Sequence, residues 1–152
     1  MIVYIGSDHA GYDLKEYIKQ VDFEQIIGFR VDFIDVGTRS KESCDYPYYA
    51  KILVKLLKKK LPFRKAGKQK TFGILICGTG FGMSMVANRF RKIRAVVCRN
   101  EEDAKIARKH NNANVICIGE RATNKTDALE SVVAFLTTPF EGGRHTKRIK
   151  MF

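Results

Sequence analysis

The stretch ICGTGFGMS, residues 76–84, joins a thiol to a glycine-rich loop. Cys77 ends an apolar run, and Gly78, Gly80 and Gly82 follow at alternate positions. Glycines let the backbone approach a ligand closely and turn successive N–H groups toward it, so the loop can hold a phosphate or a developing oxyanion. A thiol beside a helix N-terminus should ionise more easily than a free one, and a thiolate serves as a nucleophile or general base. The alternative is a tight strand–helix turn that follows a buried cysteine.

Several familiar sites are excluded by spacing. A dinucleotide fingerprint needs a glycine at position 83, where Met83 stands, and no P-loop sequence is present. The four cysteines lack the C-x-x-C spacing of zinc ribbons and redox motifs. Cys98 and Cys117 lie in apolar runs and are expected to be buried hydrophobic residues rather than parts of a disulfide framework.

The elements that must position this loop alternate along the chain. Apolar runs predict strands over 1–6, 30–37, 72–77, 93–98 and 114–119, and helical patterns cover 10–20, 46–61, 81–91, 100–110 and 127–137. Asn100 is a good N-cap, and Asn124 or Thr126 suits the last helix. Five β-α repeats indicate a parallel sheet with helices on both faces. The fold class is therefore α/β, a five-stranded, Rossmann-like α/β/α sandwich that forms one domain over residues 1–152.

Ligands of open α/β sheets bind outside the carboxyl ends of the strands. Asp8 and His9 follow the first predicted strand, Tyr46 follows the second and Arg121 follows the fifth. His110 ends the helix after the fourth strand and is expected in the same region. Asp8 could instead cap a helix, Tyr46 could be packing, and His110 could serve as a helix cap. These side chains, with Cys77, are the candidates for a site at the sheet edge.

Composition limits the possible partners. The chain has 152 residues, 45% of them hydrophobic, and a formal net charge of +12. Residues 51–70 hold nine Lys and Arg and no acid, whereas the remainder has 19 basic and 16 acidic residues. A basic insertion over about 58–70 could attract a polyanion, but a solvated surface is the favoured interpretation, so nucleic acid is not expected as a partner. A membrane span and a signal peptide are not expected either, which favours a cytoplasmic location.

The motifs together resemble those of the ribose-5-phosphate isomerase B family, which also includes allose- and galactose-6-phosphate isomerases. The resembling stretches cover nearly the whole chain in order: GSDHAGYDLK (6–15), DVGTRS and DYP (35–47), GILICGTGFGMSMVANR (73–89), IRAVVC (93–98), HNNANV (110–115) and EGGRHTKR (141–148). The resemblance implies aldose–ketose isomerisation of ribose 5-phosphate and ribulose 5-phosphate in the pentose phosphate pathway. It implies no metal and no organic cofactor.

The resemblance also implies a role for each matching residue. Cys77 would be the general base, Thr79 and His110 would open the sugar ring, and the backbone at Gly78, Thr79, Gly80 and Gly82 would hold the enediolate. Asp8, Tyr46 and Asn111 would contact sugar hydroxyls, and His9, Arg121, Arg144 and Arg148 would contact the phosphate. Family members are homodimers or homotetramers with shared pockets, so His110, Asn111 and Arg121 can serve the neighbouring chain's Cys77.

Some features depart from the family pattern or leave alternatives open. One branch of the family has a glutamate base where Met83 stands, so this chain follows the cysteine branch. The connection over 58–70 is longer than expected, and the tail, about 139–152, ends soon after Arg148. Arg144 and Arg148 could form a solvated helix face, and His145 is expected to point away from them. The alternatives are a six-carbon sugar-phosphate isomerase, a cysteine hydrolase and a polyanion-binding module.

Overall fold

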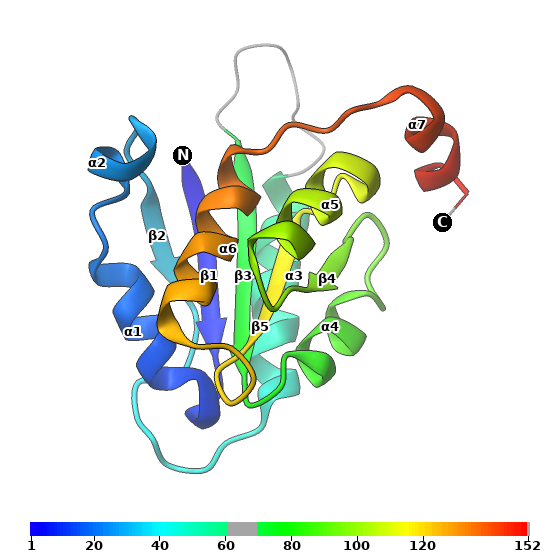
Figure 1. The fold of residues 1–152 in the computed structure, drawn as a ribbon. Helices are drawn as coiled ribbons and strands as arrows, with labels where there is room; N and C mark the ends of the chain where they lie inside the picture. The colour runs from blue at the N-terminus through cyan, green and yellow to red at the C-terminus, as the bar shows by residue number, and fades with distance from the viewer. Residues whose placement is uncertain (61–69, 152) are drawn as a thin grey trace.

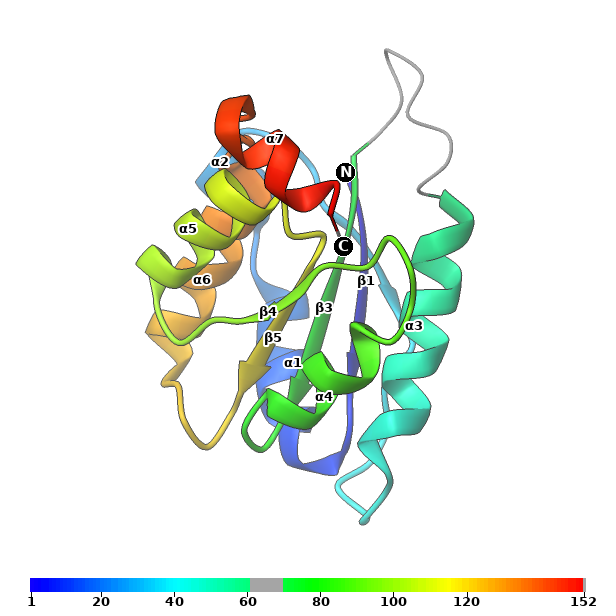
Figure 2. The same ribbon diagram turned by 90° about the vertical axis from the view of Figure 1, so that its right-hand side faces the viewer.

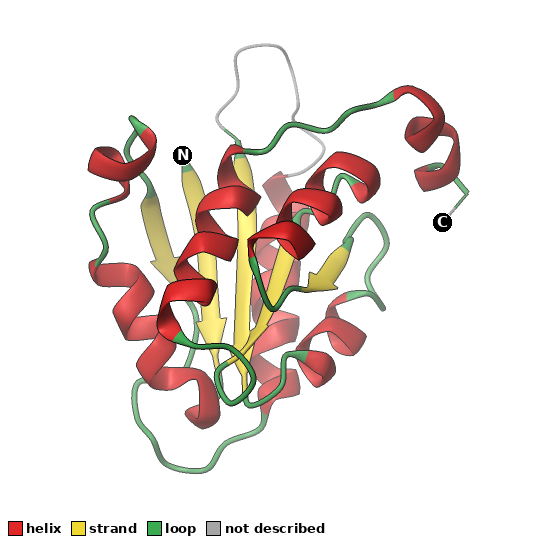
Figure 3. Cartoon of the chain, viewed as in Figure 1, coloured by secondary structure: helices red, strands yellow, loops and turns green. Residues whose placement is uncertain are grey.

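The computed structural model describes residues 1–60 and 70–151, and their strands form one parallel sheet (Figure 1). The strands are β1 (Ile2–Ser7), β2 (Asp32–Asp35), β3 (Thr71–Cys77), β4 (Ala95–Val97) and β5 (Val115–Gly119). Their order across the sheet is β2-β1-β3-β5-β4, and every neighbouring pair is parallel. Figure 3 shows all strand arrows ending at the same edge. The predicted α/β class and five-stranded sheet are confirmed.

Helices cover both faces of the sheet (Figure 2). On one face lie α1 (Tyr12–Gln20), α5 (Glu101–Asn111) and α6 (Lys125–Thr137), and on the other lie α3 (Tyr46–Lys60) and α4 (Phe81–Ala87). Three shorter helices were not predicted as elements: the 3₁₀ helix η1 (His9–Gly11), α2 (Phe23–Ile27) and α7 (Gly143–Ile149). The tail helix α7 extends beyond the body of the sheet, on the side where the strands begin (Figure 1).

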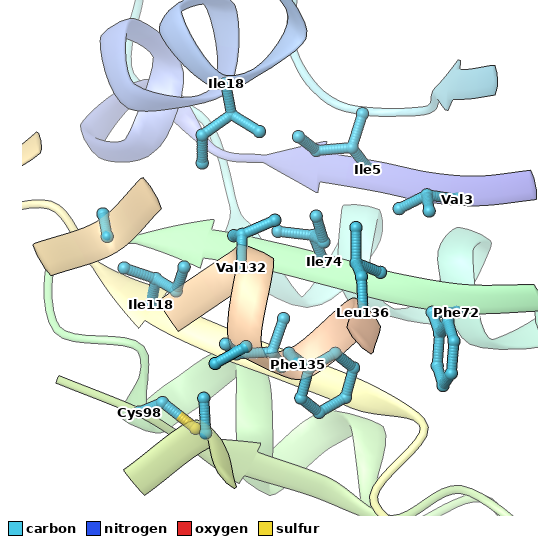
Figure 4. Packing of buried hydrophobic residues seen from close by; sticks show 14 of the residues in the cluster. Val3, Ile5, Ile18, Phe72, Ile74, Cys98, Ile118, Val132, Phe135 and Leu136 are labelled. Carbon is cyan, nitrogen blue, oxygen red and sulfur yellow. The ribbon is translucent and has the colours of Figure 1, made fainter. Parts of the chain in front are cut away.

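The alternation of side chains along β3 divides the core into two layers. Ile74 and Ile76 belong to the cluster under α1, α5 and α6, whereas Leu75 and Cys77 belong to the cluster under α3 and α4. Figure 4 shows Phe135 of α6 lying against the first of these layers. Burying one such side chain contributes about 1.5–3 kcal/mol, so both layers hold β3 firmly in place. The strand end that carries Cys77 is therefore a fixed point of the fold.

Three elements are clearly shorter than the sequence predicted. The helix expected over 81–91 ends at Ala87, and the strands expected over 30–37 and 93–98 shorten to Asp32–Asp35 and Ala95–Val97. Asn88 explains the early helix end. Its side-chain amide donates to the Ala95 carbonyl at 2.8 Å and accepts from the Ala95 N–H at 2.9 Å, which pairs this point of the chain with β4 instead of the helix.

The structure also locates two helix caps and the two ends of the basic segment. Asn100 caps α5 by accepting the Asp103 N–H at 2.9 Å, and Asn124 rather than Thr126 caps α6, accepting the Asp127 N–H at 2.8 Å. Of the basic insertion over 58–70, residues 58–60 close α3 and residue 70 precedes β3, while residues 61–69 lie outside the described part. Within the described ranges 1–60 and 70–151, no helix has the length and apolar character to cross a membrane.

Candidate active site

Cys77 is the last residue of the central strand β3, and the glycine loop folds back over its sulfur. The residue is 5% exposed and pairs in register with Gly119 at the end of β5. The Gly80 N–H donates to Cys77 Sγ at 3.2 Å, and Gly80 adopts the left-handed φ of 78° that glycine tolerates. The Phe81 N–H donates to Thr79 Oγ1 at 3.4 Å. The loop therefore turns the Gly80 N–H toward the thiol and the Phe81 N–H toward the Thr79 hydroxyl.

The glycines of this region are required by close contacts with neighbouring elements. A Cβ added at Gly119 would lie 2.6 Å from the Thr79 backbone, and one at Gly82 would lie 2.5 Å from the Tyr46 ring. A Cβ at Gly78 would lie 3.4 Å from the Arg121 guanidinium. The backbone contact at Gly119 leaves no room for a side chain, whereas a side chain at Gly82 would require the Tyr46 ring to move. The structure thus brings Tyr46 and Arg121 of the same chain to the loop, as the strand-end rule predicted.

Asp8 and His9 lie beside the same loop, at the end of β1. The Asp8 N–H donates to the Ile76 carbonyl at 3.3 Å, and the Asp8 carboxylate caps η1 by accepting the Ala10 N–H at 3.0 Å. Burial raises the pKa of Asp8, against the lowering effects of His9, the Ala10 and Gly11 backbone and Arg121. His9 Nδ1 lies 3.2 Å from both the backbone nitrogen and the carbonyl oxygen of Cys44, which engages Nδ1 and leaves Nε2 for a ligand. Asp8 is thus a helix cap and a candidate ligand at once.

His110 and Asn111 do not lie at this edge of their own chain, contrary to the sequence-based expectation. Helix α5 runs back across the sheet, so its C-terminal end returns to the side where the strands begin (Figure 1). There the Arg108 guanidinium lies 4.9 Å from the Phe72 ring, which fixes this end of α5 beside the start of β3. Cys77 is five residues further along that strand, or about 16 Å away at 3.3 Å per residue.

The tail helix α7 joins the group at the end of α5. The Glu141 N–H donates to the Lys109 carbonyl at 3.1 Å, and the rings of His110 and His145 stack at 4.3 Å between centroids and 8° between planes. His145 was expected to point away from Arg144 and Arg148, and it does so, because α7 packs on α5 and buries the His145 ring against His110. Arg144 and Arg148 are exposed on the same short helix.

The candidate residues therefore form two groups. The carboxyl-edge group comprises Asp8, His9, Tyr46, Cys77, Gly78, Thr79, Gly80, Gly82 and Arg121. The tail group comprises His110, Asn111, Arg144 and Arg148. Arg121 belongs to the first group of its own chain, whereas the resemblance had allowed it to serve the neighbouring chain. A cavity of about 440 Å³ lies beside Asn111 in the tail group, on the side of β4.

Sequence reasoning missed a buried lysine that braces the carboxyl-edge group. Lys15 is 1% exposed, and its Nζ donates to Asp35 at 2.6 Å and to Glu16 at 2.7 Å. Asp35 also accepts the Gly37 N–H at 2.9 Å, and Gly37 packs so closely on Ser7 that a Cβ there would lie 2.4 Å from the Ser7 nitrogen. The lysine therefore fixes the exit of β2 against the end of β1, next to Asp8. Cys44, which contacts His9, was missed as well.

Both groups consist of residue types that suit acid–base chemistry on an anionic ligand. The carboxyl-edge group supplies a thiol, a loop of N–H groups, an imidazole and a guanidinium, and the tail group supplies an imidazole and two guanidiniums. Arginine binds carboxylate and phosphate oxygens in pairs. Met83 is fully buried in the cluster under α3 and α4, so it contributes packing and no acid–base group.

Comparisons with known proteins match almost the whole chain. The model of the Ribose/Galactose Isomerase family matches residues 3–152. Ribose-5-phosphate isomerase B of Escherichia coli is 39% identical over 148 residues, which cover 97% of this chain and 91% of that protein. A crystal structure of a ribose 5-phosphate isomerase from Thermotoga maritima has 43% identity and a TM-score of 0.84, and the match covers 99% of this chain and 95% of that one.

A further solved structure contains a sugar phosphate. Ribose-5-phosphate isomerase B from Mycoplasma genitalium, solved with bound ribulose-5-phosphate, is 36% identical with a TM-score of 0.84, and the match covers 99% of this chain and 92% of that one. Family model, sequence and fold thus agree over almost the full length of the chain. Together with the thiol and glycine loop at the strand ends, they show that this chain belongs to the ribose/galactose isomerase family.

Proposed function

We propose that the chain is a ribose-5-phosphate isomerase that interconverts ribose 5-phosphate and ribulose 5-phosphate. The observation that carries the proposal is the placement of the Cys77 sulfur at the glycine loop, where it accepts the Gly80 N–H at 3.2 Å. Removal of a proton beside a carbonyl needs a base and a preorganised site for the oxyanion that forms. One loop supplies both in this fold. The relatives named ribose-5-phosphate isomerase B support the choice of a five-carbon substrate.

The proposed reaction begins with the open-chain aldose. Cys77 takes the proton from C2, and the electron pair moves to the C1 carbonyl oxygen, which gives an enediolate. The thiol then returns a proton to C1, and the C2 hydroxyl proton is transferred to the C1 oxygen, so that C1 becomes an alcohol and C2 becomes the ketose carbonyl. The reaction consumes no oxidant or reductant, because one carbon is oxidised as its neighbour is reduced.

Different N–H groups of the loop are proposed to stabilise the base and the oxyanion. The Gly80 N–H is directed at the sulfur, so the N–H groups of Gly78, Thr79 and Gly82 are the proposed donors to the enediolate oxygen. Such donors each contribute about 3 kcal/mol to transition-state stabilisation in sites of this kind. We assign Asp8, Tyr46 and Asn111 to the sugar hydroxyls.

The phosphate and the sugar ring need the tail group as well. We assign His9, Arg121, Arg144 and Arg148 to the phosphate, and Thr79 with His110 to ring opening. Because α5 ends beside Phe72, and Cys77 lies about 16 Å further along β3, one chain does not bring both groups to one small sugar phosphate. The proposed active form is therefore a homodimer, or a tetramer of such pairs, in which the tail group of one copy completes the carboxyl-edge group of the other.

Turnover of ribose 5-phosphate by purified wild type, Cys77→Ala and Cys98→Ala tests the proposal. We expect Cys77→Ala to lose about 10³-fold in kcat, since a positioned general base contributes about 10²–10⁴-fold. Cys98→Ala is the matched control: burial raises the pKa of that thiol to about 12, and it lies in the core under α5 and α6, so activity should persist. Substantial turnover by Cys77→Ala would contradict the assignment of the base.

Allose 6-phosphate and galactose 6-phosphate are the parallel substrates of this assay. Turnover of a six-carbon substrate alone would keep the mechanism and overturn the five-carbon choice. Inactivity toward all three sugar phosphates would contradict the proposed function itself.

A further inference from the structure

A cluster of two histidines and one glutamate stands apart from the chemistry assigned so far. His110 Nε2 lies 3.9 Å and His145 Nε2 lies 3.8 Å from the same oxygen, Glu141 Oε2. One ligand atom from each of the three residues lies within 4.8 Å of the other two. Both imidazoles therefore direct a nitrogen at one carboxylate oxygen, at separations longer than a hydrogen bond.

The backbone holds these three side chains together from two elements. His110 is on the last turn of α5, and the hydrogen bond from the Glu141 N–H to the Lys109 carbonyl, 3.1 Å long, ties the start of the tail to that turn. Gly142 then adopts a φ of 73°, and its carbonyl accepts the His145 N–H at 3.0 Å, so α7 turns back over α5. This arrangement places Glu141 and His145 on opposite sides of one tight turn.

The arrangement of the two imidazoles around one carboxylate oxygen suits a cation. A neutral imidazole presents a lone pair, which is the form that binds transition metals. Two stacked imidazoles gain nothing from each other when both are protonated. The cluster is thus better matched to a cation placed between its nitrogens than to a pair of protonated rings.

We propose that His110, Glu141 and His145 bind one divalent transition-metal ion of the zinc type. In tetrahedral zinc sites the metal lies about 2.0–2.2 Å from nitrogen and oxygen ligands, so ligand atoms are about 3.3 Å apart. The two histidine-to-glutamate distances must close by about 0.5 Å, and the two imidazoles must tilt toward each other. The side chains of His110 and Glu141 are 39% and 48% exposed and can move, whereas His145, at 8%, supplies the fixed corner.

The donor set also selects among cations. Two imidazole nitrogens and one carboxylate suit zinc, nickel and cobalt, whereas calcium and magnesium require oxygen ligands. The positive charges of Arg144 and Arg148 on the same helix oppose any cation that lacks strong bonds to nitrogen. These positive charges also favour an anion or hydroxide as the fourth ligand of the metal. We therefore expect no binding of magnesium or calcium at the cluster.

Metal binding would act on the reaction as an inhibitor, a consequence that rests on the proposed function. His110 is the residue assigned to ring opening, and a metal on its Nε2 removes that nitrogen from proton transfer. The ion is not needed for the isomerisation, which Cys77 and its loop perform by acid–base chemistry. Zinc bound at the cluster would therefore inhibit the isomerase by occupying His110.

The first test is binding of cobalt to the metal-free protein, followed by its absorption bands, with displacement by zinc. We expect one cobalt ion per chain in wild type, at least tenfold weaker binding by His145→Ala and Glu141→Gln, and unchanged binding by Glu130→Gln, an exposed carboxylate of α6. Glu141→Gln removes a surface charge alone, so it keeps the test sharp if His145→Ala fails to fold. Cys77→Ala should bind cobalt as wild type does, which separates the cluster from the thiol.

The second test is the ratio of turnover with and without zinc, measured within each variant. Wild type should lose most of its activity in micromolar zinc and recover it with a chelator, whereas Glu141→Gln should resist inhibition. Absence of cobalt binding, or binding that both variants retain in full, would overturn the site. Binding without inhibition would overturn the link to His110. Binding by a protein that lacks isomerase activity would instead contradict the proposed function and leave the metal site standing.

Discussion

Cys77 and its neighbours stand on the ends of buried strands, whereas His110, Arg144 and Arg148 stand on a helix end and a seven-residue tail helix. The carboxyl-edge group is anchored by core layers on both faces of the sheet and by neighbours so close that a Cβ added at Gly119 would lie 2.6 Å from the Thr79 backbone. The tail helix α7, by contrast, is held to α5 by one ring stack and one backbone hydrogen bond.

The two groups differ in how firmly they are anchored, and their proposed roles differ in the positional accuracy that they need. Proton transfer at carbon tolerates little error in position, since a misplacement of about 1 Å can cost 10²-fold in rate. Binding of a phosphate by long arginine side chains tolerates more, because their heads can follow the ligand. The fold therefore gives its rigid edge to the proposed base and its exposed tail to the charged groups that another copy can approach.

The largest effect should come from separating the two groups between chains. Cys77→Ala and His110→Ala are each expected to lose about 10²-fold or more in activity. A mixture of the two, refolded together, should regain about one quarter of wild-type activity, because half of the random dimers contain one site with both residues intact. The measurement is turnover of ribose 5-phosphate before and after subunit exchange.

A control mixture and one contrary result decide whether the two groups are shared between copies. A mixture of Cys77→Ala with Cys77→Ala,His110→Ala is the matched control and should gain nothing. If the first mixture also stays inactive while the dimers have exchanged, the two groups serve the same chain, and the division between copies is wrong.

A smaller effect is expected from the exposed arginines of the tail. Arg144→Ala should raise KM for ribose 5-phosphate about 10–100-fold with little change in kcat, since a hydrogen bond to a charged group contributes about 1.5–3 kcal/mol. Lys147→Ala, an exposed cation of the same helix, is the control for general loss of charge. Equal KM values for the two variants would remove Arg144 from the phosphate site.

The smallest effect on chemistry, and a measurable one on stability, is expected from Lys15→Met. Loss of the buried ammonium should lower the free energy of unfolding by about 1–3 kcal/mol, since Lys19 still bonds Asp35 at 2.6 Å. The variant should keep a similar kcat, because Lys15 supports the carboxyl-edge group without touching the loop. Thermal unfolding and turnover at pH 7 together provide the measurement.

The difference in stability between wild type and Lys15→Met should change with pH in a defined direction. Hydrogen bonds from Lys15 and Lys19 lower the pKa of Glu16. Burial acts to raise the pKa of Asp35, but the hydrogen bonds from the same two lysines outweigh it, so the pKa of Asp35 is lowered as well. Stability from a carboxyl with a lowered pKa is present above its unfolded value and is lost as the pH falls through the folded value. The gap between wild type and Lys15→Met should therefore narrow below about pH 4.5. A gap that widens on acidification would contradict this account.

The sequence predicts the buried parts of the fold better than its edges. β3 and β5 are buried on both faces and appear as continuous apolar runs, which makes their positions readable. The end of α4 depends on the pairing of Asn88 with Ala95, a tertiary contact that no local pattern contains. Lys15 looks like a surface lysine because its carboxylate partner Asp35 comes from another element.

The candidate site shows the same division. The rule that ligands bind at strand ends locates Asp8, His9, Cys77 and Arg121, because these residues directly follow strands. It misplaces His110, although a helix between parallel strands must return to the edge where the strands begin. His145 was missed because its partner, Glu141, becomes a neighbour only through the turn at Gly142.

The return of α5 to the far edge of the sheet has a consequence for how activity depends on concentration. If the carboxyl-edge and tail groups meet only between copies, a solitary chain holds all the required residues and yet has no complete site. Specific activity would then fall on dilution, because the total rate would follow the square of the protein concentration once most chains are apart. Substrate that bridges the two copies would oppose that loss, so the sugar phosphate would help to assemble the enzyme that consumes it.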